Sequence, residues 1–197
     1  MSRVFLFDTE TTGFLDTKPH IVQLGFLLMS DDREVASFHT LIDPEGQWEV
    51  PPDSTKVHGI TTEMCLDTGI PIRDALMTFE QFAYMAGRLV AHNYEFDSTV
   101  IDMELIRLGL PGNYFSDVRQ YCTMKAATDV CQIPFASGGR GGKKFKYPKL
   151  DEAYRHFTQR EMSDAHTAWG DVRACHTVFQ YLQSAHAING GIVPETW

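Results

Sequence analysis

Apolar residues recur along the chain in two spacings, and these spacings predict strands that alternate with helices. Four consecutive apolar residues of β-favouring type, residues 4–7, predict a fully buried strand. Residues 21–29 and 34–42 are also strand-like, and the polar run at 30–33 between them suits a hairpin turn. Together these three segments predict an antiparallel meander at the start of the chain.

After the meander the pattern changes to helices separated by short strands. Thr61 is placed to cap a short helix, and apolar residues at three- and four-residue intervals after Pro71 predict a longer one. Residues 88–91 predict a fourth strand and residues 114–118 a fifth, each followed by a helix. Strands that alternate with helices after a meander indicate an α/β domain with a mixed sheet.

The first predicted strand ends in two carboxylates, Asp8 and Glu10, followed by a Thr-Thr-Gly turn. Since residues i and i+2 of a strand lie on one face, both side chains point the same way. Two like charges at the end of a buried strand repel each other and are poorly solvated unless a cation lies between them. Mg²⁺ and Mn²⁺, which prefer oxygen ligands, are the natural candidates. The alternative is a pair of acids that face water beside an ordinary turn.

Two further acids each begin the core-facing stripe of a helix. Asp97 does so in the helix after the fourth strand, and Asp171 in the last helix. Helix capping explains Asp97 as well as metal binding does. His166 lies five residues before Asp171, a separation of about 140° on a continuous helix, so we expect it on a loop or first turn. A single His is usually structural or exposed, but beside these acids His166 becomes a candidate for proton transfer.

A basic, glycine-rich segment interrupts the α/β pattern at residues 132–149. Residues 138–149 hold five Lys and Arg side chains and no acid. Phe145 and Tyr147 alternate with lysines, a composition that suits a phosphate backbone and a stacked base. The alternative is a solvated loop or a β-hairpin flap. We favour contact with an anionic substrate, because the chain as a whole carries a net charge of −9.

The composition narrows the class of protein. A chain of 197 residues, 43% of them hydrophobic, is long enough for one well-buried core. Its negative charge argues against a general nucleic-acid coat, but not against an enzyme that reaches phosphates through metal ions. No apolar stretch is long enough to span a bilayer and no signal-peptide pattern begins the chain, so we expect a cytoplasmic protein without membrane contact. No zinc-type spacing links the cysteines, which we expect to be reduced: Cys65, Cys122, Cys131 and Cys175.

Three motifs carry the candidate chemistry: Asp-x-Glu at residues 8–10, His-Asn-x-x-Phe-Asp at 92–97 and His-x4-Asp at 166–171. As a set they resemble the DEDDh exonucleases, the DnaQ-like group that includes the proofreading subunit of bacterial replicative polymerase, RNase T, oligoribonuclease and the TREX enzymes. The resemblance covers roughly residues 4–182. It implies a ribonuclease H-like fold, in which helices flank a mixed five-stranded sheet.

The domain organisation follows from the same resemblance. We expect one exonuclease domain over residues 1–187 and a short tail over residues 188–197. The basic, glycine-rich segment is an insertion in this domain at about residues 132–149. It precedes a Leu-Asp pair that resembles the helix before the third motif in relatives, which places the insertion near the active-site side.

The resemblance also assigns roles to individual residues. It implies that two divalent metal ions, Mg²⁺ or Mn²⁺, are held by Asp8, Glu10, Asp97 and Asp171, and that His166 is the general base. The positions that match the pocket for the 3′-terminal nucleotide are Thr11, Thr12, Phe14, His58, Ile60 and Asn93. Each of these also has a structural explanation, as turn former, core residue or helix-start residue. The basic side chains expected to contact the substrate are Arg140, Lys143, Lys144 and Lys146.

The activity implied is metal-dependent removal of nucleoside monophosphates from single-stranded or frayed 3′ ends. DNA is the first choice of substrate because the proofreading type is the nearest general resemblance, and RNA 3′-end trimming is the close alternative. A polymerase or another replication protein is an expected partner. A non-catalytic polymerase-accessory module that binds nucleic acid would not need four acids and His166. A metal phosphatase or nucleotide hydrolase fits the basic segment less well.

Overall fold

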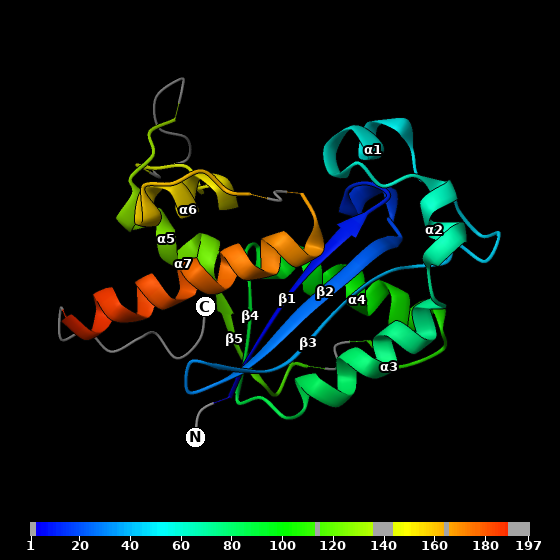
Figure 1. Cartoon of the computed structure of the whole chain (residues 1–197), viewed down its shortest axis with the longest axis horizontal. Coiled ribbons are helices and arrows are strands. Elements are labelled where there is room, and N and C mark those ends of the chain that lie inside the picture. Colours follow the sequence, from blue (N-terminus) through cyan, green and yellow to red (C-terminus); the bar gives the residue numbers. More distant parts are fainter. Residues whose placement is uncertain (1–2, 113–114, 136–143, 164–165, 189–197) are drawn as a thin grey trace.

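The computed structural model describes residues 3–112, 115–135, 144–163 and 166–188. Its centre is a five-stranded sheet with the strand order β3-β2-β1-β4-β5 (Figure 1). β1 pairs antiparallel with β2 and parallel with β4, so the sheet is mixed and the predicted α/β fold is confirmed. The strands are β1 Arg3–Thr11, β2 Ile21–Ser30, β3 Arg33–Leu41, β4 Arg88–Ala91 and β5 Arg119–Cys122.

The predicted fifth strand at residues 114–118 is wrong. β5 begins at Arg119, residues 115–118 form a turn, and residues 113–114 lie outside the described part of the chain. β5 is an edge strand that opens on two polar residues, so its hydrophobic pattern is weak. The apolar Phe115 that suggested a strand instead packs its ring on Phe79, with 5.6 Å between the centroids.

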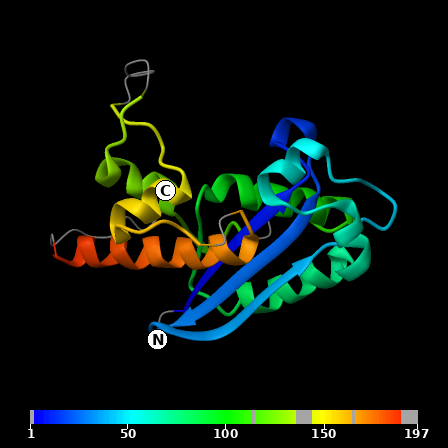
Figure 2. The ribbon, with the colours of Figure 1, turned by 45° about the horizontal axis from the view of Figure 1, so that its top comes forward.

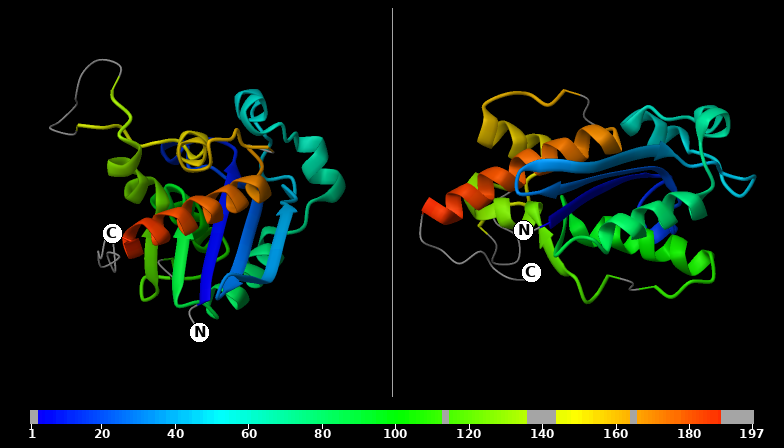
Figure 3. Two further views of the ribbon diagram at one scale, coloured as in Figure 1. Left: turned by 60° about the vertical axis from the view of Figure 1, so that its left-hand side comes forward. Right: turned by 60° about the horizontal axis from the view of Figure 1, so that its bottom comes forward.

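Seven α-helices and one short 3-10 helix occur in the described residues: η1 Leu15–Thr17, α1 Pro52–His58, α2 Thr62–Thr68, α3 Ile72–Ala83, α4 Tyr94–Arg107, α5 Thr123–Cys131, α6 Leu150–Thr158 and α7 Ala168–Ile188. Helices α3 and α4 cover one face of the sheet, and α5, α6 and α7 pack on the other (Figure 3). The predicted cap of α2 is confirmed, since the Thr61 hydroxyl accepts the Met64 N–H at 3.2 Å. No described helix combines the length and the apolar character that crossing a membrane requires.

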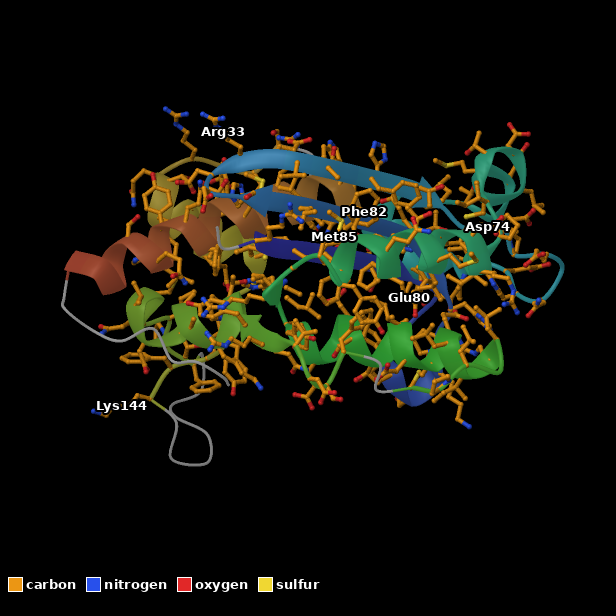
Figure 4. All side chains as sticks on the ribbon, turned by 90° about the horizontal axis from the view of Figure 1, so that it is seen from below. Arg33, Asp74, Glu80, Phe82, Met85 and Lys144 are labelled. Atoms are coloured by element: carbon orange, nitrogen blue, oxygen red, sulfur yellow. The ribbon has the colours of Figure 1, made fainter. Side chains whose placement is uncertain are left out.

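Alternation along β1 decides which side chains reach each face. Phe5 and Phe7 point toward α3, where their rings meet Phe79 edge-on at 4.9 and 5.3 Å. Phe82 reaches from α3 toward β2, and its ring lies 5.4 Å from that of Phe26 (Figure 4). A slip of β1 by one residue would move Phe5 and Phe7 to the other face of the sheet. Burial of these rings stabilises the fold by about 2 kcal/mol per ring and so fixes the register.

The even-numbered residues of β1 face α7. Leu6 belongs to the core cluster beneath α7, together with Val172 and Val178 of that helix. Asp8 and Glu10 continue this row toward the end of the strand, where α7 begins (Figure 1). The sequence of β1 therefore changes from a buried apolar face to a pair of carboxylates at the edge of the core.

Candidate active site

Three carboxylates from two distant parts of the chain meet at the end of β1. Asp8, Glu10 and Asp171 each bring one oxygen to within 4.8 Å of the others. Asp8 and Glu10 belong to β1, and Asp171 lies in the first turn of α7. All three side chains are half-buried. Over the described residues, this is the one group of three or more potential metal-binding side chains that the geometry brings together.

Asp97, in the first turn of α4, is not part of this group of three, but its charge acts on Asp8 and Glu10. It is 3% exposed, and its Oδ1 accepts both the Thr9 backbone N–H at 2.9 Å and the Thr9 hydroxyl at 2.7 Å. Asn93, not Asp97, occupies the N-cap of α4. Asp97 is therefore bound to β1 across the fold, and helix capping does not account for it.

The four acids disfavour one another's ionisation. Burial first, and then the charges of the other three, raise the pKa of Asp8 well above its usual value. The same two causes raise the pKa of Glu10 to about 8. Burial raises the pKa of Asp97 to about 7 and that of Asp171 to about 6, although hydrogen bonds to both oppose the shift. A cation would relieve this repulsion, so the oxygen-only donor set fits a divalent metal ion.

His166 lies beside these acids and just before α7 begins. It is exposed, and its backbone is in the left-handed region at φ 64°, which is uncommon for a residue with a side chain. Its backbone N–H donates to Asp171 Oδ1 at 3.3 Å. His166 and Asp171 are thus coupled through the backbone, while the imidazole stays outside the core.

A cavity of about 380 Å³ opens next to Glu10. Its walls come from the end of β1 and the following turn, from α1, and from the start of α4. Figure 2 shows α1 beside η1 at this end of the sheet. Four of the predicted substrate residues line it: Thr11, Phe14, His58 and Asn93. The sequence analysis missed α1, which adds Asp53, Ser54 and Val57; the Pro at its start was the available signal.

Phe14 and His58 differ sharply in exposure within this cavity. Phe14 is 78% exposed, which is unusual for a large aromatic side chain. His58 is 8% exposed, and its Nδ1 accepts the Ile60 N–H at 3.1 Å, so the ring proton is on Nε2. Burial lowers the pKa of His58, which keeps the ring neutral at physiological pH. The cavity therefore offers one free aromatic face and one neutral donor.

Thr11, Thr12 and Ile60 make contacts within the protein. The Thr11 hydroxyl donates to the Gly13 carbonyl at 2.8 Å, and the Thr12 hydroxyl accepts the His20 N–H at 2.9 Å. Both hydroxyls thus hold the turn after β1. Ile60 is 4% exposed in a small core cluster with Val22, Val50 and Cys65. Their contact with substrate stays a prediction.

The basic side chains expected to contact substrate have different surroundings. Lys146 binds both carboxylate oxygens of Glu152, at 2.6 and 2.9 Å, at the start of α6. Lys144 is exposed and points away from the fold (Figure 4). Arg140 and Lys143 lie outside the described residues.

A buried ionic network that the sequence analysis missed supports the turn after β1. Glu104 of α4 is 3% exposed, forms an ion pair with Arg107 Nη1 at 2.9 Å, and accepts from the Ile21 N–H at 3.1 Å and His20 Nδ1 at 3.2 Å. These bonds keep the pKa of Glu104 below its usual value, although burial opposes them. The available signal was an acid on the apolar stripe of a helix, three residues before an Arg.

Comparisons with known proteins assign the chain to a family. The RNase_T family model, described as "Exonuclease", matches residues 5–179. The DNA polymerase III subunit epsilon of Treponema pallidum is 26% identical over 185 residues, which are 94% of this chain and 78% of that protein. "Uncharacterized exonuclease CP81" of Escherichia phage 186 is 29% identical over 177 residues, 87% of this chain and 82% of the phage protein.

Solved structures share the fold at low sequence identity. Escherichia coli exonuclease I in complex with a dA16 oligonucleotide gives a TM-score of 0.76 at 15% identity, over 95% of this chain. This chain spans 42% of the length of that protein. Since the family model covers most of the sequence, the chain belongs to the RNase T-type exonuclease family.

Proposed function

We propose that this protein removes nucleoside monophosphates from single-stranded or frayed DNA 3′ ends, in the 3′-to-5′ direction. The convergence of Asp8, Glu10 and Asp171 to within 4.8 Å, next to a cavity of about 380 Å³, carries the proposal. A hydrolase for a chain end needs both parts, a charged centre for the phosphodiester and a pocket for the terminal nucleotide. Membership of an exonuclease family supports the same reaction.

The four acids Asp8, Glu10, Asp97 and Asp171 would hold two divalent ions, Mg²⁺ or Mn²⁺. When bound, such ions activate a water and stabilise negative charge on the attacking and leaving oxygens. The acids supply only oxygen donors, which suit hard cations. Burial, and after it the charges of the neighbouring acids, raise the pKa values of Asp8 and Glu10, and a bound cation would favour their ionised forms.

His166 is the general base of the proposed reaction. Its ring is exposed, so it can take a proton from the attacking water and pass it to solvent. The hydrogen bond from its backbone N–H to Asp171 keeps the base next to the acids. An imidazole has a pKa near neutrality, which is the range in which one group can both accept and release a proton.

The cavity would receive the terminal nucleotide. The exposed ring of Phe14 offers a stacking surface for a base, which is sequence-tolerant because every base has an aromatic face. The neutral His58 can donate from Nε2, and Thr11 and Asn93 complete the wall. Outside the cavity, we propose that Lys144 contacts the phosphate backbone together with Arg140 and Lys143, and that Lys146 does so despite its pairing with Glu152.

The choice of DNA rests on the relatives. A DNA polymerase III subunit matches over most of both proteins, and the exonuclease I structure holds a DNA oligonucleotide. The same relatives support a polymerase as partner. RNA 3′-end trimming is the second candidate function.

Digestion of matched DNA and RNA oligonucleotides tests this proposal. Each strand is labelled at the 5′ or the 3′ end and incubated with Mg²⁺, Mn²⁺ or EDTA. We expect a ladder from the 5′ label, early loss of the 3′ label, and no product in EDTA. His166→Ala should lower kcat by roughly 10²-fold or more, a typical loss for a general base, whereas the exposed His156→Ala serves as control. Intact DNA and RNA after incubation with either metal would contradict the proposal.

A further inference from the structure

The start of α7 is held by a side chain from β2. The backbone N–H of Ala168, the first residue of α7, donates to Gln23 Oε1 at 2.8 Å. The first N–H groups of a helix have no partner within the helix, so an acceptor from another element fixes the position of its first turn. Gln23 is paired with Glu10 in the β1–β2 register, which places it next to the acid cluster.

The backbone of α7 also touches β2 directly. A Cβ atom added at Gly25 would lie 2.9 Å from the carbonyl carbon and oxygen of Ala168. Real Cβ atoms do not approach backbone so closely, so Gly25 is needed for this contact. Gly25 is paired with Asp8 in the β1–β2 register. The first turn of α7 therefore sits on the strand that neighbours Asp8 and Glu10.

A second contact holds the same turn from the edge strand β3. The Trp169 ring stacks on His39 with 5.2 Å between centroids and 27° between planes. The Arg173 guanidinium lies 4.4 Å from the centre of the Trp169 ring and pairs with Glu34 of β3 at 3.1 Å. The start of α7 is thus held from two strands, by Gln23 of β2 and by His39 and Glu34 of β3.

We propose that Gln23 is a positioning residue that sets His166 and Asp171 for the reaction. It holds Ala168, which lies two residues after His166 and three before Asp171. His166 in turn donates its N–H to Asp171, so both groups move with the first turn of α7. A displacement of about 1 Å at a reacting group can cost roughly 10²-fold in rate. This assignment rests on the proposed exonuclease function and on His166 as its base.

Two replacements of Gln23 separate positioning from general stability. Gln23→Met keeps the length of the side chain but removes the acceptor, whereas Gln23→Glu keeps an acceptor oxygen. We expect Gln23→Met to lower kcat about tenfold or more with KM changed by less than twofold, and Gln23→Glu to recover most of the rate. The exposed Gln47→Met is the matched control and should keep wild-type kinetics.

A double-mutant cycle tests whether Gln23 acts through His166. If it does, Gln23→Met costs less in the His166→Ala background than in the wild type, because one of the two groups it positions is gone. Backbone amide hydrogen exchange gives a readout that needs no activity. We expect faster exchange at residues 166–171 in Gln23→Met than in the wild type or Gln23→Glu, with unchanged exchange in β1 and α3.

The outcomes distinguish failure of the positioning role of Gln23 from failure of the proposed exonuclease function. Wild-type kcat in Gln23→Met, or a loss that multiplies fully with that of His166→Ala, overturns the positioning role. Faster exchange spread over the whole fold assigns Gln23 to general stability and overturns it as well. If the wild-type protein leaves every oligonucleotide intact, the proposed function fails, and the exchange at residues 166–171 alone decides whether Gln23 holds this turn.

Discussion

Replacing Asp8 with Asn should stabilise the metal-free protein at alkaline pH. Among the carboxylates around Asp8, Glu10 and Asp171 have oxygens within 4.8 Å. One fully ionised pair at this distance costs about 3.5 kcal/mol at an effective dielectric constant of about 20, and about 0.9 kcal/mol in bulk water. The acids are partly solvated, so the repulsion energy of a pair lies between these two limits. Removing one charge should therefore increase the free energy of unfolding by about 1–3 kcal/mol at pH 8.5.

The effect should depend on pH with a definite sign. The pKa of Glu10 is raised to about 8 in the folded protein, and that of Asp171 to about 6, above the ordinary carboxyl values near 4. The folded state therefore binds more protons than the unfolded state between about pH 4 and pH 8, and its stability falls as the pH rises through this window. At pH 5 the acids are largely protonated, and Asp8→Asn should change the stability little.

Urea unfolding in EDTA at pH 5.0 and pH 8.5 measures both effects. The exposed Asp67→Asn removes one charge far from the cluster and should stay within about 0.5 kcal/mol of the wild type at both values. Addition of Mg²⁺ at pH 8.5 should stabilise the wild type more than Asp8→Asn, because the cation relieves the same repulsion. An equal change in stability on Asp8→Asn at the two pH values would refute the electrostatic account of this site.

Three further changes test other parts of the structure. Thr9→Val removes one of the two donors to Asp97, so calorimetry should show Mn²⁺ bound several-fold more weakly, whereas Thr9→Ser should keep the wild-type affinity. Glu104→Ala leaves Arg107 without its buried partner and should cost about 3–5 kcal/mol in urea unfolding; a loss below 1 kcal/mol would exclude a structural role for the network. Phe14→Ala should raise KM for oligonucleotides about fivefold or more with kcat nearly unchanged, corresponding to about 1–3 kcal/mol of lost stacking, and a fall in kcat alone would contradict the stacking role.

Local sequence patterns predicted much of the fold and part of the candidate active site. The face shared by Asp8 and Glu10 follows from strand geometry alone, because side chains alternate with a period of two. The position of His166 outside α7 followed from helical spacing, since its offset from Asp171 does not fit one continuous face. The meeting of Asp97 and Asp171 with the strand acids depends on tertiary structure, and only the resemblance to the DEDDh exonucleases indicated it.

The remaining elements depend on contacts between distant segments. Gln23 looks like an ordinary polar residue of a strand until the fold brings Ala168 to it, 145 residues later in the chain. Glu104 interrupts an apolar stripe and is explained only by its partners His20 and Arg107. β5 is short and polar at its start, and it forms because β4 offers a paired edge. Propensity cannot supply such information, since the decisive partner lies elsewhere in the sequence.

The way in which the acids are held explains how an acidic protein can act on a polyanion. Asp97 is fixed by the amide and hydroxyl of Thr9, and Asp171 by the amide of His166, all of them uncharged donors. The ion pairs of the described residues use other acids, among them Glu104 and Glu152. A Lys or Arg at the site would neutralise the carboxylates and compete with a cation for them. Because uncharged donors fix the positions of Asp97 and Asp171, these acids stay available to divalent ions, which would favour their ionised forms and attract the phosphates of the substrate.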